Sequence, residues 1–415
     1  MLAMKSKIRG QNSSMWTPSF ILMLSINLFN SAGQYMIGAS LPKYANYLGA
    51  EPVLVGLVSS VFSVSALAIR PITGSALDYF SKKNMLCISL GITSVMYLTC
   101  AFTDNVNVLV ATRFIDGLGA SVKVPLCLAL ATEFLPKNQV GSGIGVYSLA
   151  QAIASALGPG ISLGVINHCG YRISLLLTFG VSMAAFYLAT MLKEENYIRP
   201  PEPFRISFQN IYAKEAIFPA LIILTLAMPY SCTMAYLSIM GGLYGIADIG
   251  LFFTVYSIVL FVARPIFGKM LDKVDFTKII IPSLISYAVA MILISKARTL
   301  TFFLVAAIFA AFGYGVDHPC LQSMCMKWVP SNRLGAGGNT YYMGVDIGHF
   351  VGAMLSGKLI TYLMISRPEA QAYSDGFMYQ VVPISISICV TVVAGKLRRK
   401  NTDEHQTESN NQTYC

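Results

Sequence analysis

The feature that most constrains the fold of this chain is a series of twelve long apolar runs separated by short polar segments. The runs occupy about residues 17–39, 52–72, 84–103, 106–131, 140–166, 171–192, 216–240, 248–268, 279–296, 300–328, 338–364 and 376–395. A helix that crosses the hydrocarbon core of a bilayer needs about 20 apolar residues. Because lipid offers no hydrogen-bonding partners, such a run has to satisfy its own backbone groups, which a helix does. The pattern therefore predicts an all-α membrane protein with twelve transmembrane helices.

The small number of charged residues supports a lipid rather than an aqueous surrounding. Only 12% of the residues are charged, whereas soluble domains carry about 25%. The net charge of +10 comes largely from lysines and arginines between the runs, as is typical of cytoplasmic loops, so we expect a lipid bilayer and no nucleic acid as partner. The sequence holds no Gly-x-x-x-x-Gly-Lys-Ser/Thr motif for a nucleotide and no nucleophile–base constellation. We therefore expect neither ATP-driven transport nor an enzyme.

The distribution of basic residues predicts the orientation. With a cytoplasmic amino terminus, the inner segments hold nineteen lysines and arginines and the outer segments five. Such an excess marks the cytoplasmic side, so both termini are expected inside, in a plasma membrane that we interpret as a bacterial inner membrane. Residues 193–215 are predicted to be a cytoplasmic linker between six-helix bundles at 1–192 and 216–396, and the polar residues 397–415 a disordered tail.

An internal repeat relates the two predicted bundles. The segment RPITGSALD, which runs from Arg70 to Asp78, matches RPIFGKMLD, which runs from Arg264 to Asp272, at an offset of 194 residues. The segments PKNQVG (136–141) and PSNRLG (330–335) match at the same offset. Two matches in one register indicate duplicated halves, an architecture that is found in secondary transporters.

Three motifs carry a resemblance to the major facilitator superfamily over nearly the whole chain. The family's loop motif after the second helix is matched by Gly74, Asp78, Lys82 and Lys83, although Tyr79 and Ser81 replace a usual Arg and Gly. Its fourth-helix motif is matched by Arg113, Gly117 and Gly119. The fifth-helix motif of its drug/proton antiporter branch is matched by Gly158 and Pro159, with Ala154 in place of a Gly.

This resemblance implies two pseudo-symmetric six-helix bundles that alternate access to a central site. Gly74 and Asp78, and by the repeat Gly268 and Asp272, are then expected to form cytoplasmic gates, each Asp near the start of a helix in the opposite half, where the helix dipole favours an anion. Capping of the loops is the alternative role for both Asp residues. Gly158 and Pro159 are expected to act as a hinge in the fifth helix.

Ionisable residues inside the apolar runs are candidates for proton coupling. Each costs at least about 2.5–3.5 kcal/mol at mid-span, so a functional role is the first interpretation. Arg113 and Asp116 are three residues apart and can pair on one helix face, either for coupling or only for packing. Lys123, in the same run, is expected either to face the cavity as the partner of an anion or to extend towards the interface.

Two Asp–His sets occur in the carboxy-terminal half. Asp317 is followed by His318, and Asp346 lies three residues before His349. Carboxyl and imidazole groups can change protonation in a protein interior, whereas Arg stays charged. We therefore consider a proton relay through Asp317, Asp346 and His349, with satisfied polar contacts between helices as the alternative.

The first run presents amides on one face, because Asn27, Asn30 and Gln34 are spaced by three and four residues. Amides can hydrogen-bond a solute, so these residues, with Lys123 and Tyr230, are candidates to line a substrate cavity. The spacing of His318, Cys320 and Cys325 matches no established metal site, and we expect neither a metal nor a cofactor.

Taken together, these features favour a monomeric, proton-coupled exporter, or antiporter, of small organic molecules. A proton-coupled importer, or symporter, of a sugar, organic acid or metal chelate is the alternative within transporters. A solute sensor that does not transport is the alternative from another class. The sequence names no substrate.

Overall fold

The computed structural model describes residues 15–136, 139–192, 212–270, 274, 276–330 and 333–396. The first half holds α1 (Pro18–Tyr47), α2 (Pro52–Tyr79), α3 (Lys82–Phe102), α4 (Val106–Glu133), α5 (Val140–Cys169) and α6 (Tyr171–Thr190). The second half holds the short 3-10 helix η1 (Lys214–Ala216), then α7 (Ile217–Leu243), α8 (Leu251–Met270), α9 (Phe276–Lys296), α10 (Leu300–Lys327), α11 (Leu334–Met364) and α12 (Glu369–Met378). After a short turn the last span continues as helix to Lys396.

The helices are long enough to cross a bilayer. Eleven of the described spans meet the length and hydropathy expected of a membrane helix. The remaining helix, α8, has 20 residues from Leu251 to Met270. At a rise of about 1.5 Å per residue it is about 30 Å long, the thickness of the hydrocarbon core. The predicted all-α membrane fold is confirmed.

Local sequence signals explain where several helices begin and end. Thr17 caps α1 by accepting a hydrogen bond from the Phe20 N–H at 3.2 Å, and Pro18 follows it at the first helical position. Ser81 caps α3 in the same way. Gly170, with φ of 84°, is the one-residue link between α5 and α6, a backbone conformation that favours glycine. The tight link makes α5 and α6 antiparallel neighbours.

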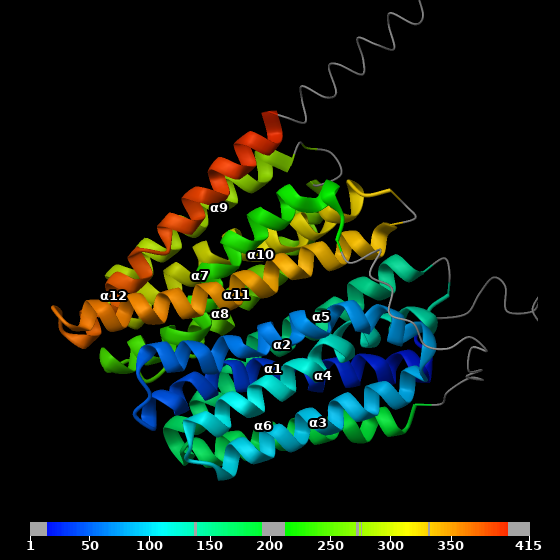
Figure 1. The fold of residues 1–415 in the computed structure, drawn as a ribbon, viewed down its shortest axis with the longest axis horizontal. Coiled ribbons are helices and arrows are strands. Elements are labelled where there is room, and N and C mark those ends of the chain that lie inside the picture. The colour runs from blue at the N-terminus through cyan, green and yellow to red at the C-terminus, as the bar shows by residue number, and fades with distance from the viewer. Residues whose placement is uncertain are drawn as a thin grey trace, which may run out of the picture.

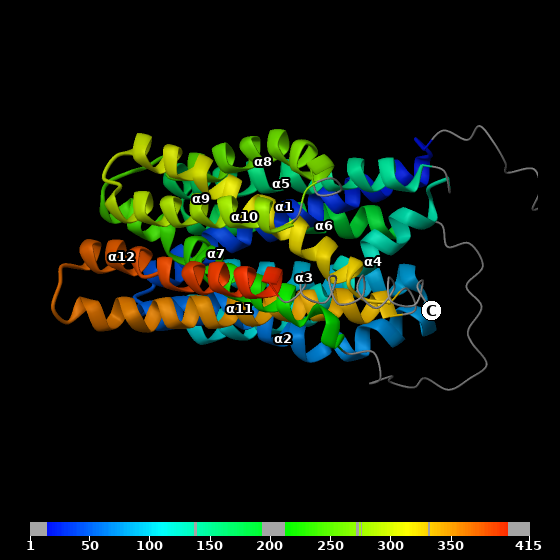
Figure 2. The ribbon, with the colours of Figure 1, turned by 90° about the horizontal axis from the view of Figure 1, so that it is seen from above.

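The helices form two bundles, which Figure 1 shows one above the other and Figure 2 shows after a quarter turn. In the first, α1 packs against α5 and α6, and α2 packs against α4. In the second, α7 packs against α11, and α10 packs against α8 and α9. The bundles meet along two main seams, α2 with α11 and α5 with α8. Both seams pair a helix of the first half with one of the second.

One end of the molecule joins the two halves closely, and we call it the closed end. It carries the connections from α1 to α2, α5 to α6 and α7 to α8, opposite the end where α1 begins and the last span ends at Lys396 (Figure 1). Here Tyr236 Oη on α7 lies 2.8 Å from the Pro52 carbonyl oxygen of α2 and 2.9 Å from that of Ala353 on α11. On the other seam, Thr254 Oγ1 of α8 donates to the Ala156 carbonyl of α5 at 3.0 Å. Neutral hydrogen bonds therefore connect the bundles at this end.

Candidate functional site

A buried group of charges lies in the first bundle, and we call it the Asp116 cluster (Arg113, Asp116, Lys123 and Thr93). Arg113 Nη1 lies 2.7 Å from Asp116 Oδ2, the pair that the spacing of three residues predicts. Lys123 Nζ donates to Thr93 Oγ1 at 2.7 Å and lies 3.4 Å from Asp116 Oδ1. Thr93 Oγ1 in turn donates to Asp116 Oδ1 at 2.9 Å. The side chains of Asp116 and Lys123 are each only 1% exposed.

Two helices besides α4 hold this cluster in place. Thr93 belongs to α3, and Phe62 of α2 lies beneath the Arg113 guanidinium at 4.6 Å from ring centroid to Cζ. A cation over an aromatic face is favourable in a desolvated site. Gly117 allows α4 to approach α2, because a Cβ there would overlap the Phe62 carbonyl. Lys123 therefore reaches neighbouring helices and not the membrane interface.

A second charge pair connects the two halves. Arg70 Nε of α2 donates to Asp346 Oδ2 of α11 at 2.6 Å, and the side chains are 15% and 8% exposed. The Arg70 guanidinium also lies over the Tyr342 ring at 4.7 Å, and Tyr342 Oη accepts from Gln322 Nε2 at 3.3 Å. The pair thus combines a charge-assisted hydrogen bond with an aromatic contact on the partner helix.

The position of this pair along the bundle follows from helix geometry. Arg70 is eighteen residues after Pro52, the start of α2, and Asp346 is eighteen residues before Met364, the end of α11. Both therefore lie about 27 Å along their helices from the closed end. Arg70 was not among the candidates from the sequence, although it opens the repeated segment RPITGSALD. Its position in the repeated segment is the sequence feature that could have identified it as a candidate.

The two Asp–His sets of the second bundle do not act as hydrogen-bonded pairs in the structure. Asp317 on α10 accepts from the Ser283 hydroxyl of α9, and its second oxygen, Oδ2, is buried without a hydrogen-bond partner among the described residues. His318 instead lies between rings, with centroids 5.5 Å from Tyr314 and 5.4 Å from Tyr341. The neighbouring positions 317 and 318 therefore face different surroundings.

In the second set, Asp346 binds Arg70 and His349 lies among aromatic rings. The imidazole stacks on Tyr230 of α7 with centroids 5.4 Å apart, and Tyr230 stacks on Tyr314 of α10 at 4.2 Å. His349 Nε2 is buried and has no hydrogen-bond partner in the described part of the chain. The candidate Tyr230 thus joins α7, α10 and α11 through its ring.

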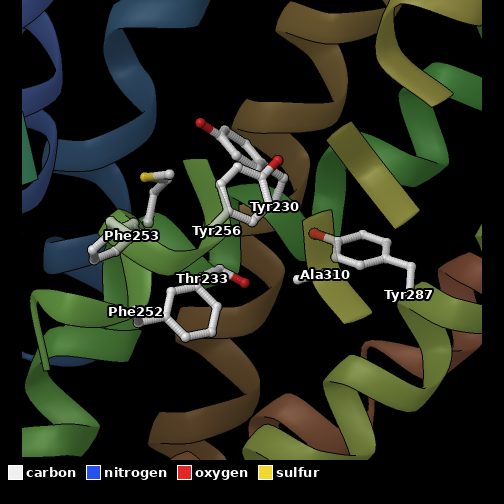
Figure 3. A pocket seen from close by; sticks show the side chains of 8 residues that line it. Tyr230, Thr233, Phe252, Phe253, Tyr256, Tyr287 and Ala310 are labelled. Atoms are coloured by element: carbon white, nitrogen blue, oxygen red, sulfur yellow. The ribbon is translucent and has the colours of Figure 1, made fainter. Parts of the chain in front are cut away.

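A small pocket opens beside Tyr230 in the second bundle, and Figure 3 shows its lining. The residues come from α7, α8, α9 and α10 and are Tyr230, Thr233, Met234, Phe252, Phe253, Tyr256, Tyr287 and Ala310. In Figure 3 the rings of Tyr230 and Tyr256 lie close together, with Phe252 and Tyr287 on either side of Thr233 and Ala310. The lining is aromatic and apolar, with tyrosine and threonine hydroxyls as its polar groups.

The amide face of α1 is largely buried, and one of its three amides bonds to another helix of the first bundle. Asn27 is buried and its Nδ2 donates to the Tyr147 carbonyl of α5 at 3.0 Å. Asn30 is buried on the same helix, and Gln34 is half-buried. Gly158, the predicted hinge residue beside Pro159, lets α5 approach α1.

The predicted gate motif lies mostly outside the described side chains. Gly74 and Asp78 belong to α2 and Gly268 to α8, but their side-chain surroundings are not described, and Asp272 lies outside the described residues. Lys82 is described and forms an ion pair with Glu133 of α4, within the first bundle, and Lys83 is half-buried. The structure therefore leaves the gate hypothesis as a prediction. Among the described residues, no three His, Cys, Asp or Glu side chains come together as a metal site would require.

Comparison with known proteins gives relatives over nearly the full chain. The sequence model of the Major Facilitator Superfamily matches residues 23–247 and 219–411. The quinolone resistance protein NorA of Staphylococcus aureus is 24% identical over 398 residues, which cover 91% of this chain and 97% of NorA. An uncharacterised transporter of the same superfamily from Methanocaldococcus jannaschii is 22% identical over 363 residues, which cover 85% of this chain and 92% of the relative.

Solved transporter structures share the fold at low sequence identity. A bacterial homologue of the human lysosomal transporter Spinster, in an inward-facing and unoccupied conformation, has a TM-score of 0.75 at 13% identity and covers 93% of this chain and 98% of its own. The nucleoside transporter NupG has a TM-score of 0.71 at 12% identity, covering 91% of this chain and 98% of its own. Because the family model matches residues in both bundles, the protein belongs to the Major Facilitator Superfamily and is a multi-pass membrane transporter.

Proposed function

We propose that this transporter is a proton-coupled exporter that exchanges protons for small organic molecules by alternating access. The observation that carries the proposal is the buried Arg70–Asp346 pair, in which a titratable carboxyl connects the two halves of the molecule far from the closed end. NorA supports export, since its name assigns it to quinolone resistance and its likeness spans 91% of this chain.

The charge pair offers a direct route from protonation to movement. While Asp346 is ionised, it attracts the permanently charged Arg70 across the seam between α2 and α11. A hydrogen bond to a charged group contributes about 1.5–3 kcal/mol, so a proton on Asp346 removes much of the attraction between the halves. Proton uptake then favours separation of the bundles at this depth, and release favours their contact.

The remaining elements of the cycle extend the same proposal. We place both termini in the cytoplasm, so the closed end with Tyr236 faces outward. Bundles 1–192 and 216–396 move relative to each other, with 193–215 as linker. Asp78 and Asp272 act as gates at the cytoplasmic end, and α5 bends at Gly158. One chain holds both bundles, so a monomer is sufficient for the cycle.

The proposed substrates are small organic molecules that contact the aromatic surface of the second bundle. Tyr230 lines the pocket of Figure 3 and stacks on His349, three residues after Asp346. Aromatic faces bind planar or cationic groups. A substrate that contacts α7 and α11 in this way therefore touches the helix that carries Asp346 and the helix packed against it.

The test is transport by the purified protein in liposomes with an imposed pH difference, first with a quinolone as probe. An antiporter accumulates the probe on the acidic side, whereas a symporter accumulates it on the alkaline side. In Asp346→Asn, which is permanently uncharged, we expect uphill accumulation to fall by at least about tenfold, which corresponds to about 1.4 kcal/mol. Exchange of labelled for unlabelled probe without a gradient should persist, because that exchange does not require net proton movement.

Asp346→Glu is the matched control, since it keeps a titratable carboxyl and should retain part of the coupling. Asp346→Asn with undiminished uphill transport would assign the coupling proton to another residue. A wild-type protein that exchanges the probe but never accumulates it would be a uniporter. A wild-type protein that binds solutes but moves none would be a sensor.

A further inference from the structure

We propose that Lys123 is a second proton-binding site of the transport cycle, located in the first bundle and separate from Asp346. The proposal deepens the proposed proton-coupled function and rests on it. It starts from the charges of the Asp116 cluster. Two cationic side chains, Arg113 and Lys123, contact a single carboxylate there, and no other carboxylate contacts either of them in the part of the chain that the structure describes.

An excess charge in a closed apolar site is costly. Desolvation of an ion is offset only when an opposite charge and hydrogen bonds accompany it. The Asp116 carboxylate accepts hydrogen bonds from Arg113 at 2.7 Å and from the Thr93 hydroxyl at 2.9 Å, whereas its distance to Lys123 Nζ is 3.4 Å. Lys123 is therefore the less well compensated of the two cations.

Only one member of the cluster can release the excess charge. Arg is not deprotonated in proteins. Asp116 would increase the net positive charge if it took up a proton. The Lys123 ammonium can lose one proton and become a neutral amine, which leaves the Arg113–Asp116 pair balanced. As an amine it still has N–H groups to donate to Thr93 Oγ1, so the hydrogen bonds of the cluster survive the change.

The neighbours of Lys123 offer no other carboxylate to compensate it. Tyr97 of α3 faces the cluster near Asp116, and Cys127 lies one turn beyond Lys123 on α4. Tyr147 of α5 lies near Cys127. The residue that α2 contributes is the aromatic ring of Phe62. Apart from Asp116 and Arg113, the described groups near Lys123 are thus aromatic, hydroxyl and thiol, and none of them carries a negative charge in its usual state at neutral pH.

The burial of the cluster decides which species binds there. With the Lys123 and Asp116 side chains each 1% exposed and Arg113 8% exposed, an organic anion has no open surface to approach in this conformation. A proton needs no such space and can pass along the hydroxyl of Thr93, which connects Lys123 Nζ to Asp116 Oδ1. The exchanged species is therefore a proton, taken up when movement of α3 against α4 admits water.

Counting protons tests the assignment. In a weakly buffered detergent solution, a pH indicator reports protons released per quinolone bound, with binding measured in parallel. Wild type is expected to release protons from both sites. Asp346→Asn and Lys123→Met should each release about one proton fewer than wild type, and the double variant none. Lys123→Arg, which keeps the charge but cannot give up its proton, should lose the same proton as Lys123→Met.

Each outcome separates the two proposals. If Asp346→Asn alone abolishes proton release and Lys123→Met leaves it unchanged, Lys123 is structural and the inference fails while proton coupling stands. If wild type binds the probe without releasing protons, the proposed coupling itself fails. If Lys123→Met binds a neutral probe but loses an acidic one, the cluster is an anion site and the proton assignment is overturned. Lys123→Gln serves as the second neutral variant should Lys123→Met fold poorly.

Discussion

The two bundles of this transporter differ in whether their buried polar side chains find partners within the same bundle. In the first, Arg113, Asp116, Lys123 and Thr93 contact one another within a single cluster. In the second, Asp317 Oδ2 and His349 Nε2 are buried without hydrogen-bond partners among the described residues, and Asp346 binds across the seam to Arg70. A buried polar group without a partner is costly. In the described residues the second bundle also holds the hydroxyls of Ser238, Thr361 and Tyr373 in this state, whereas the first bundle holds only that of Tyr97. We infer that the second bundle contains groups that change partners during the cycle.

This difference assigns the bundles different roles. The first bundle binds its carboxylate internally, and movement of the halves leaves the Arg113–Asp116 bond intact. The second presents its carboxylate to the other half and places its imidazole among aromatic rings. We infer that the second bundle contacts the substrate, and that the first keeps its Arg113–Asp116 pair in place while Lys123 exchanges a proton.

The largest expected effect is on stability in the first bundle. Asp116→Asn leaves Arg113 and Lys123 buried without a carboxylate, and removal of one partner from a buried pair costs about 3–5 kcal/mol. We expect a strongly lowered midpoint of thermal unfolding in detergent and poor yield. Lys123→Met, which leaves the Arg113–Asp116 pair balanced, is the control and should unfold near the wild-type temperature. An Asp116→Asn protein as stable as wild type would mean that another anion serves the cluster.

A smaller effect is expected from His349→Gln in the second bundle. Glutamine retains a polar side chain but does not titrate, whereas an imidazole can take up a proton in a conformation of the cycle that exposes it to water. We expect the pH optimum of transport to shift more than the maximal rate falls. The measurement is the rate of probe uptake into liposomes across a series of pH values. Tyr230→Leu, which removes the stacking ring and keeps the imidazole, is the control. A lowered rate with an unchanged optimum would make His349 a packing residue.

The smallest effect is expected from Asp317→Asn, which repeats the substitution of Asp116 in the other bundle. No cation pairs with Asp317 among the described residues, and an amide oxygen can still accept from the Ser283 hydroxyl. We expect the free energy of unfolding to change by less than about 1 kcal/mol. Chemical unfolding of Asp317→Asn and Asp116→Asn under the same conditions measures this free energy for both variants. Equal destabilisation of both would remove the contrast between the bundles.

The fold was predictable because its signals are local or repeated. Apolar runs long enough for the bilayer identify the helices, and the fixed offset between the Arg70 and Arg264 segments indicates the two halves. The helix α8 illustrates the second signal, because the Arg264 segment that it contains matches the Arg70 segment of α2 and makes the two helices equivalent in the repeat.

The sites were predictable only in part, and two equal spacings show why. Arg113 and Asp116 are three residues apart and pair, while Asp346 and His349 are three residues apart and do not. Spacing brings side chains onto one face, but the strongest available partner decides the contact. For Asp346 that partner is Arg70, a permanent cation 276 residues away in sequence, which only the packing of α2 on α11 reveals. Thr93, which connects Lys123 to Asp116, could not be predicted from spacing either, because it lies on another helix.

The Tyr236 hydroxyl at the closed end limits how strongly the equilibrium between the two conformations of the carrier can favour one of them. A hydroxyl has one hydrogen, so the carbonyls of Pro52 and Ala353 share it. A neutral hydrogen bond contributes about 0.5–1.5 kcal/mol, and about 1.4 kcal/mol is a factor of ten in population. This contact alone therefore biases the carrier by about an order of magnitude at most, so thermal motion can reopen it without an external energy source. A buried ion pair at the same place would hold the closed end shut between turnovers.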